Sequence, residues 1–164
     1  MKILTIITLA LTLTTSLFAG ATDSKMVTLE TPTRFSADVF AIGTFDGDRN
    51  DHYKSTFGAG LGLNYNLCKY GAVGVDAYWF DNTSTVHSIT ASVIGKYPMG
   101  DLIPYALVGG GVHFDSVREG SVHAGIGAEY KLNQSFSLVT ECRYNWTALD
   151  NDFGVAKLGL RLNF

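Results

Sequence analysis

The stretch FGVAKLGLRLNF, residues 153–164, decides the fold of this chain. Successive side chains of a strand point to opposite faces. As a strand, this stretch has one uncharged face, rich in Leu, and one face that carries the cations Lys157 and Arg161. A water-soluble sheet buries its apolar face, whereas a membrane β-barrel turns that face outward to lipid and keeps the polar face inside. The rest of the chain distinguishes these two arrangements.

The first 21 residues have the features of a secretory signal peptide. Lys2 supplies the positive charge, residues 3–18 form an uncharged run, and Ala19-Gly20-Ala21 is a cleavage site of small residues. A retained membrane anchor is the alternative, but the run is shorter than the roughly 20 residues that a spanning helix needs. We therefore expect cleavage after residue 21, a periplasmic lead-in at 22–34 and one domain at 35–164.

Composition excludes other classes of protein. Without Lys2 the chain has eleven Lys and Arg (12 − 1) and fifteen Asp and Glu, a net charge of −4 with neutral His. This charge argues against a nucleic-acid partner. No run of eighteen apolar residues follows the signal peptide, so no second spanning helix is expected. The 18 Gly and only 3 Pro suit strands with tight bends.

Eight segments of about ten residues have strand patterns, and short breaks rich in turn-forming residues separate them. This length lets a tilted strand cross a membrane. No helical period interrupts the series, so the sequence predicts an all-β fold, an eight-stranded up-and-down antiparallel transmembrane β-barrel. The predicted strands are 35–45, 57–67, 72–80, 86–97, 105–114, 122–132, 136–147 and 153–164.

With an even number of strands, the first strand begins and the last strand ends on the same side of the membrane, which we expect to be the periplasm. The outward connections are then only slightly longer than the periplasmic turns, so little of the protein is expected above the membrane. These outward connections are 46–54, 81–85, 115–121 and 148–152.

The two predicted faces differ in kind. No charged residue falls on the lipid face, and aromatic residues gather near the strand ends, as in interfacial girdles. A soluble lipocalin-type barrel would expose the charged face and would crowd the aromatic residues into a lumen too narrow for them. The inward face collects the strand charges Asp38, Asp76, Glu129, Glu141, Lys96, Lys131, Arg143, Lys157 and Arg161.

On these features the chain resembles the small outer-membrane β-barrels of the OmpA membrane-domain, OmpX and opacity-protein type, a porin-like family of Gram-negative bacteria. The signal peptide, the eight strands, the Gly-rich PYALVGGGVHF (104–114) and the closing LGLRLNF (158–164) carry the resemblance, which covers residues 35–164. It implies an outer-membrane location. It also implies that the barrel-assembly machinery reads a terminal signal formed by Leu160, Leu162 and Phe164.

The turn centres predict the strand registers. Because a buried charge is costly unless it is paired, we interpret the lumen as a structural plug built from Asp38, Asp76, Glu129, Glu141, Arg143, Lys157 and Arg161. A charged ion path is the alternative, but eight strands leave little bore. The predicted inward neighbours are Phe40 with Gly60, Ile42 with Gly58, Tyr78 with Gly60, Glu141 with Lys157, and Asp38 with Arg161.

Two sets of residues could be taken for metal sites, but an ordinary structural role explains each set better. Asp46, Asp48 and Asn50 begin like a calcium loop, but Asp51 and Phe57 stand where such a loop needs Gly and Glu. His113 and His123 are predicted to face each other near the outer mouth, yet two imidazoles do not complete a metal site.

A catalytic site is also weakly indicated. Ser88 opposite His113, with Asp115 beyond, has the composition of a hydrolytic triad. Related barrels that modify lipid A need sites that reach lipid, whereas this trio points inward. The two cysteines, Cys68 and Cys142, are expected to lie far apart as free thiols.

Two functions therefore remain open, a structural or surface-interaction barrel with a plugged lumen and a narrow porin for ions or small solutes. A lipid-modifying enzyme is a remote third. We expect no enzymatic activity, no cofactor and no nucleic-acid partner. The expected partners are outer-membrane lipid, the barrel-assembly machinery and an unidentified surface ligand.

Overall fold

The structure is a computed structural model that describes residues 34–46, 56–81, 85–114, 118–148 and 152–164. The predicted signal peptide and nearly all of the lead-in lie outside these ranges, as does most of the calcium-like loop. No helix in the described ranges is long and apolar enough to span a membrane.

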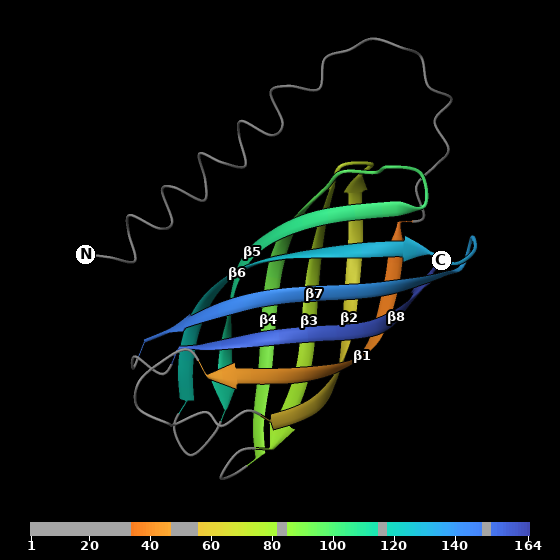
Figure 1. The fold of residues 1–164 in the computed structure, drawn as a ribbon. Coiled ribbons are helices and arrows are strands. Elements are labelled where there is room, and N and C mark those ends of the chain that lie inside the picture. The colour runs from red at the N-terminus through yellow and green to blue at the C-terminus, as the bar shows by residue number, and fades with distance from the viewer. Residues whose placement is uncertain (1–33, 47–55, 82–84, 115–117, 149–151) are drawn as a thin grey trace. The chain divides into compact units, whose positions relative to one another are not determined.

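The eight strands form a closed antiparallel barrel in sequence order, which confirms the predicted fold class (Figure 1). The last strand pairs with the first, and the backbone N–H groups of Phe35 and Phe164 each donate to the other residue's carbonyl, at 3.2 and 3.0 Å. The strands are β1 (Phe35–Asp46), β2 (Thr56–Cys68), β3 (Gly71–Asp81), β4 (Thr85–Lys96), β5 (Leu102–Phe114), β6 (Arg118–Lys131), β7 (Phe136–Thr147) and β8 (Phe153–Asn163).

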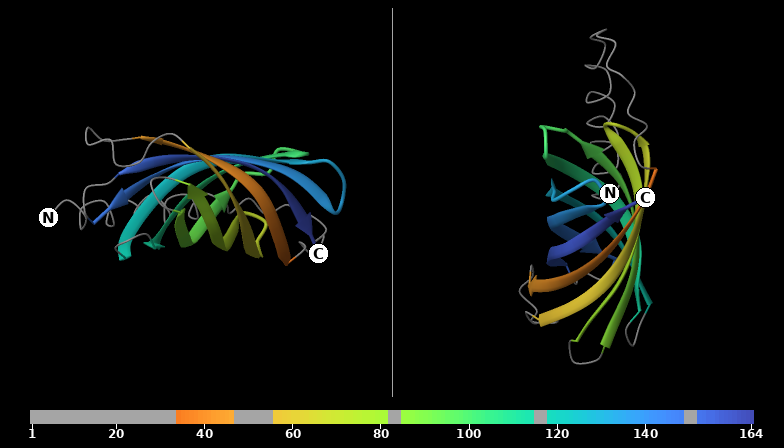
Figure 2. Two further views of the ribbon diagram at one scale, coloured as in Figure 1. Left: turned by 90° about the horizontal axis from the view of Figure 1, so that it is seen from below. Right: turned by 90° about the vertical axis from the view of Figure 1, so that its right-hand side faces the viewer.

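The strands are strongly tilted, as closure of a narrow barrel requires. In Figure 1 the wall of β6, β7, β8 and β1 crosses in front of β2, β3 and β4, and Figure 2 shows both walls curving around the lumen. Three short turns, at 69–70, 97–101 and 132–135, lie with the start of β1 and with Phe164 at what we call the turn end. The other four connections leave from the opposite end, the loop end.

Most predicted strand ends are close to those observed, but two strands begin earlier. β5 begins at Leu102 instead of residue 105, and β6 begins at Arg118 instead of residue 122. The polar run from Arg118 to Ser121 reads as a loop in the sequence, yet a polar lumen accepts Glu119 and Ser121 as inward strand residues. The fifth connection is therefore shorter than the predicted 115–121.

The longer β6 corrects one predicted register. His113 lies opposite Glu119, and His123 lies opposite Gly109, so the two histidines do not face each other as predicted. The error arose because the turn was centred too late in the sequence. The other registers are confirmed, namely Phe40 with Gly60, Ile42 with Gly58, Tyr78 with Gly60, Glu141 with Lys157, Asp38 with Arg161, and Ser88 with His113.

Gly60 shows how the narrow lumen accommodates bulky side chains. It lies between Phe40 on β1 and Tyr78 on β3. A Cβ atom at this position would overlap the Phe40 ring and lie 2.6 Å from the Tyr78 Cβ. Glycine at this position therefore leaves the space that the two aromatic residues fill, and the alternation of large and small inward residues follows the barrel's limited bore.

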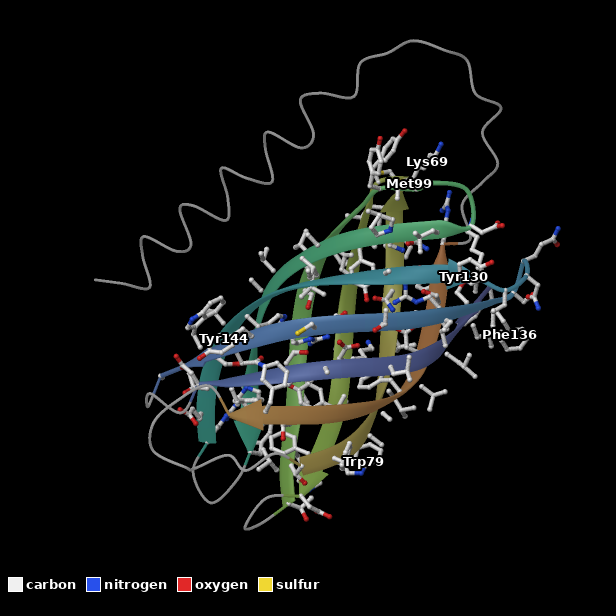
Figure 3. All side chains as sticks on the ribbon, in the orientation of Figure 1. Lys69, Trp79, Met99, Tyr130, Phe136 and Tyr144 are labelled. Atoms are coloured by element: carbon white, nitrogen blue, oxygen red, sulfur yellow. The ribbon has the colours of Figure 1, made fainter. Side chains whose placement is uncertain are left out.

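The outer surface is apolar, as predicted. Side chains such as Leu61, Ile126 and Leu138 are exposed, and the labelled Trp79, Tyr130, Phe136 and Tyr144 point away from the strands near their ends (Figure 3). The prediction that no charge falls on this face is wrong at the loop end, because the extended strands place the exposed Asp81 and Arg118 there.

We predict that Ile126→Arg, in the middle of β6, lowers the free energy of unfolding by about 2–4 kcal/mol, because it places a cation in hydrocarbon. The matched variant Leu132→Arg, just beyond the turn end of the same strand, should cost only about 0–1 kcal/mol. Urea unfolding in lipid vesicles measures both values. Equal losses at the two positions would contradict the assignment of this face to lipid.

Candidate functional site

The lumen holds a continuous network of charged side chains, all of them buried except the half-buried Lys96. Four carboxylates and four cations take part, so the network is neutral (4 − 4 = 0). Each side chain comes from an inward position of its strand, and the strands bring together residues that are far apart in sequence. The members are Asp38, Asp76, Glu129, Glu141, Lys96, Arg143, Lys157 and Arg161.

Arg161 organises the half of the network that is nearer the turn end. Its Nε lies 2.7 Å from Asp38 Oδ1 and its Nη2 lies 2.8 Å from Asp38 Oδ2, a bidentate contact across the β1–β8 seam. Its Nη1 donates to Glu129 Oε2 at 2.7 Å. Such paired charge-assisted hydrogen bonds fix geometry as well as charge. Both carboxylates are therefore held by one guanidinium.

Lys157 links the two halves of the network. Its Nζ lies 3.5 Å from Asp38 Oδ2 and 3.3 Å from Asp76 Oδ1, and it also sits 4.0 Å from the centroid of the Phe40 ring. Glu141 is its neighbour in register, as predicted, but Lys157 reaches across the lumen to the two aspartates instead. Register thus identified the strand neighbour but not the ionic partners.

Arg143 holds the other half of the network. It pairs with Asp76 Oδ2 at 2.5 Å and with Glu141, and its Nη1 donates to Thr90 Oγ1 at 3.2 Å. The second oxygen of Glu141 accepts from the Tyr105 hydroxyl at 3.0 Å. With its hydrogen bonds satisfied in this way, the buried guanidinium is compensated for its loss of water.

The turn-end mouth is more open. Lys96 Nζ donates to Asn66 Oδ1 at 2.8 Å and lies 3.9 Å from Glu129. Lys131, which shares the inward side of β6, is exposed at the rim. The structure therefore brings together every predicted plug residue and leaves Lys131, which the sequence also places inward, in contact with solvent.

Two apolar clusters flank the charges. The sequence interpretation placed Phe40, Ile42 and Tyr78 of the first cluster on the inward face but predicted neither cluster as a whole. One lies in the loop half of the lumen, and the other lies toward the turn end. No strand contributes more than two residues to either cluster, so no local run in the sequence signals them. The loop-half cluster contains Phe40, Ile42, Tyr78, Phe80, Val86, Phe153 and Val155, and the turn-half cluster contains Ala72, Ile94, Tyr105, Leu107 and Val139.

A small cavity lies beside the charges, lined among others by Asn64, Ser92 and Arg143. It encloses about 10 Å³, room for roughly one water molecule. The cavity can hydrate the network, but it is too small for a hydrated ion.

The two histidines that the sequence considered as metal ligands contact different serines, and one of these contacts joins the considered catalytic pair Ser88 and His113. His113 Nδ1 is 2.7 Å from Ser88 Oγ, and its Nε2 is 2.8 Å from Ser121 Oγ. His123 Nε2 is instead 2.9 Å from Ser92 Oγ. Asp115 lies outside the described residues. Both imidazoles are buried, so in this arrangement they fill the lumen with polar contacts.

The remaining predicted residues lie on the outside. Leu160, Leu162 and Phe164 are exposed on the outward face of the β8 end. Both cysteines are free thiols, as predicted, and both are exposed. Cys142 lies within β7, and Cys68 lies at the end of β2.

The chain belongs to the family of outer membrane protein beta-barrel domains, whose model matches residues 7–164. A barrel of this family resides in the outer membrane. The fold and the apolar outer surface described above agree with this family. No curated protein matches the chain in sequence.

Solved structures share the fold at low identity. Neisserial surface protein A is similar with a TM-score of 0.67 at 18% identity, covering 79% of this chain and 97% of that one. The N-terminal barrel of Pseudomonas aeruginosa OprF has a TM-score of 0.61 at 16% identity, covering 79% and 97%. The outer membrane enzyme PagL has a TM-score of 0.53 at 13% identity, covering 77% and 99%. The fold therefore hosts both enzymes and other proteins, and function must be argued from the residues.

We predict that Arg143→Met destabilises the barrel by about 3–5 kcal/mol, because it leaves the carboxylates of Asp76 and Glu141 without this cation. Adding Glu141→Gln should restore part of the loss. The free energy of unfolding in urea measures both changes.

Lys131→Met is the matched control, since it removes a cation from the same side of the barrel wall at an exposed position. It should change stability by less than about 0.5 kcal/mol. An Arg143→Met variant as stable as this control would show that the buried pairs contribute nothing.

Proposed function

We propose that this protein is a closed outer-membrane barrel with a structural or surface-interaction role. The observation that carries this proposal is that the neutral ion-pair network and the loop-half apolar cluster together fill the lumen. A permeating ion would have to separate Arg143 from Asp76 and then pass between Phe80 and Phe153, whose ring centroids are 5.8 Å apart. Both steps are costly in a lumen whose cavity has room for only about one water molecule.

A narrow porin is the second candidate function. The water-sized cavity and the partly exposed Lys96 near the turn end favour it, because they give an ion a partial path from that end. The path ends at the loop-half cluster, whose residues are at most 4% exposed. We therefore place the function of this protein on its outer surfaces and connections instead of its lumen.

We further propose that the protein is not an enzyme. Ser88 and His113 are each 1% exposed and lie on the inward face, where a lipid substrate has no access. The fold shared with PagL at 13% identity does not transfer that activity. The partners that we propose are membrane lipid along the apolar surface and, during biogenesis, the assembly machinery acting on a signal peptide-directed chain.

We predict that the refolded protein shows no steady single-channel conductance in planar lipid bilayers. The reason is that ion pairs and apolar side chains together fill the bore. Insertion should be verified on the same samples by flotation with vesicles and by the heat-dependent gel shift of folded barrels. Large and steady current steps from inserted protein would instead support the narrow porin.

A further inference from the structure

A row of four side chains crosses the outward face at the loop end of β3, β4, β5 and β6. Trp79 is paired in register with His87, His87 with Phe114, and Phe114 with Arg118. Each lies within two residues of the loop-end limit of its strand. Trp79, His87 and Arg118 are exposed and Phe114 is half-buried. Figure 3 shows Trp79 pointing away from the barrel at this end.

Arg118, at the β6 end of this row, is the group that carries its positive charge. Its guanidinium carbon lies 5.3 Å from the centroid of the Phe114 ring, a cation–π geometry that restrains the long side chain. Among the described residues it makes no ion pair. In the described ranges, the exposed carboxylate near the row is that of Asp81, which accepts a hydrogen bond from Thr85 Oγ1 at 3.1 Å. Within the part of the chain that the structure describes, the guanidinium therefore has N–H donors available for an anion.

The surroundings favour an anion that is attached to a hydrocarbon chain. One step further from the loop end, β3, β4 and β5 present the outward residues Ala77, Ile89 and Val112, which are paired in register. Trp and Phe are side chains that prefer the membrane–water interface. On the lipid-facing side of the sheet, cationic and hydrogen-bonding groups at the loop end thus lie next to apolar residues that are further from that end.

We propose that this row binds the phosphate headgroup of a membrane lipid, with the lipid's acyl chains lying along the apolar wall below. Guanidinium forks bind phosphate oxygens in a bidentate manner. His87 supplies a further N–H donor, and Trp79 bounds the site on the β3 side. The proposal rests on the family's membrane location and is independent of whether the lumen conducts.

Fluorescence quenching of Trp79 tests this proposal directly. The chain has 2 Trp residues, so Trp146→Phe leaves Trp79 as the single reporter. This variant is placed in phosphatidylcholine nanodiscs that contain a minor fraction of acyl-brominated phosphatidic acid. Local enrichment of the phosphate lipid should be about fivefold over its mole fraction, which corresponds to about 1 kcal/mol. Brominated phosphatidylcholine at the same fraction should show no enrichment.

Arg118→Gln should abolish the enrichment, whereas Lys131→Gln, which removes the same charge at the turn end, should leave it unchanged. If Arg118→Gln does not refold, His87→Ala in the same assay should reduce the enrichment. Quenching at the mole fraction in the parent, or an equal loss in Lys131→Gln, would overturn the proposal. Loss of enrichment on addition of millimolar inorganic phosphate would show a site for a free anion and would also overturn it.

Discussion

The bidentate pair between Asp38 and Arg161 joins the first strand to the last, across a sequence separation of 123 residues. Lipid offers no hydrogen-bond partners, so a β-sheet can cross a membrane only when it has no free edges. Closing the β1–β8 seam removes the last edge and also isolates the lumen from the surroundings. Every polar group that faces inward must then be satisfied mainly by other inward groups.

That requirement explains how the charged side chains in the lumen are arranged. Arg161, Lys157 and Arg143 each contact two carboxylates, so each cation compensates charges from more than one strand. The network also specifies strand register. A slip of one residue in β8 would turn Arg161 toward lipid and Leu160 into the lumen, because successive side chains alternate between faces. We interpret the buried charges as a means of fixing one register as well as a plug.

The sequence predicted the barrel because its alternation is strong and its turns are short. It also predicted Asp38 beside Arg161, since register follows from turn centres. It failed at the fifth hairpin, where Glu119 and Ser121 read as loop residues although a polar lumen accepts them. It did not identify the partners of Lys157, because a long side chain can reach past its neighbour in register. Scattered inward residues such as Phe80 and Phe153 left no local pattern.

The central claim is that the paired charges fill the lumen, stabilise the barrel and fix the register of its strands. A double-mutant cycle at the seam tests it most directly, with Asp38→Asn, Arg161→Met and the double variant unfolded by urea in lipid vesicles. The structure predicts that each single change is strongly destabilising and that the double variant loses less than their sum, by about 1–3 kcal/mol. Strictly additive losses would mean that the two residues do not interact, and would contradict the claim.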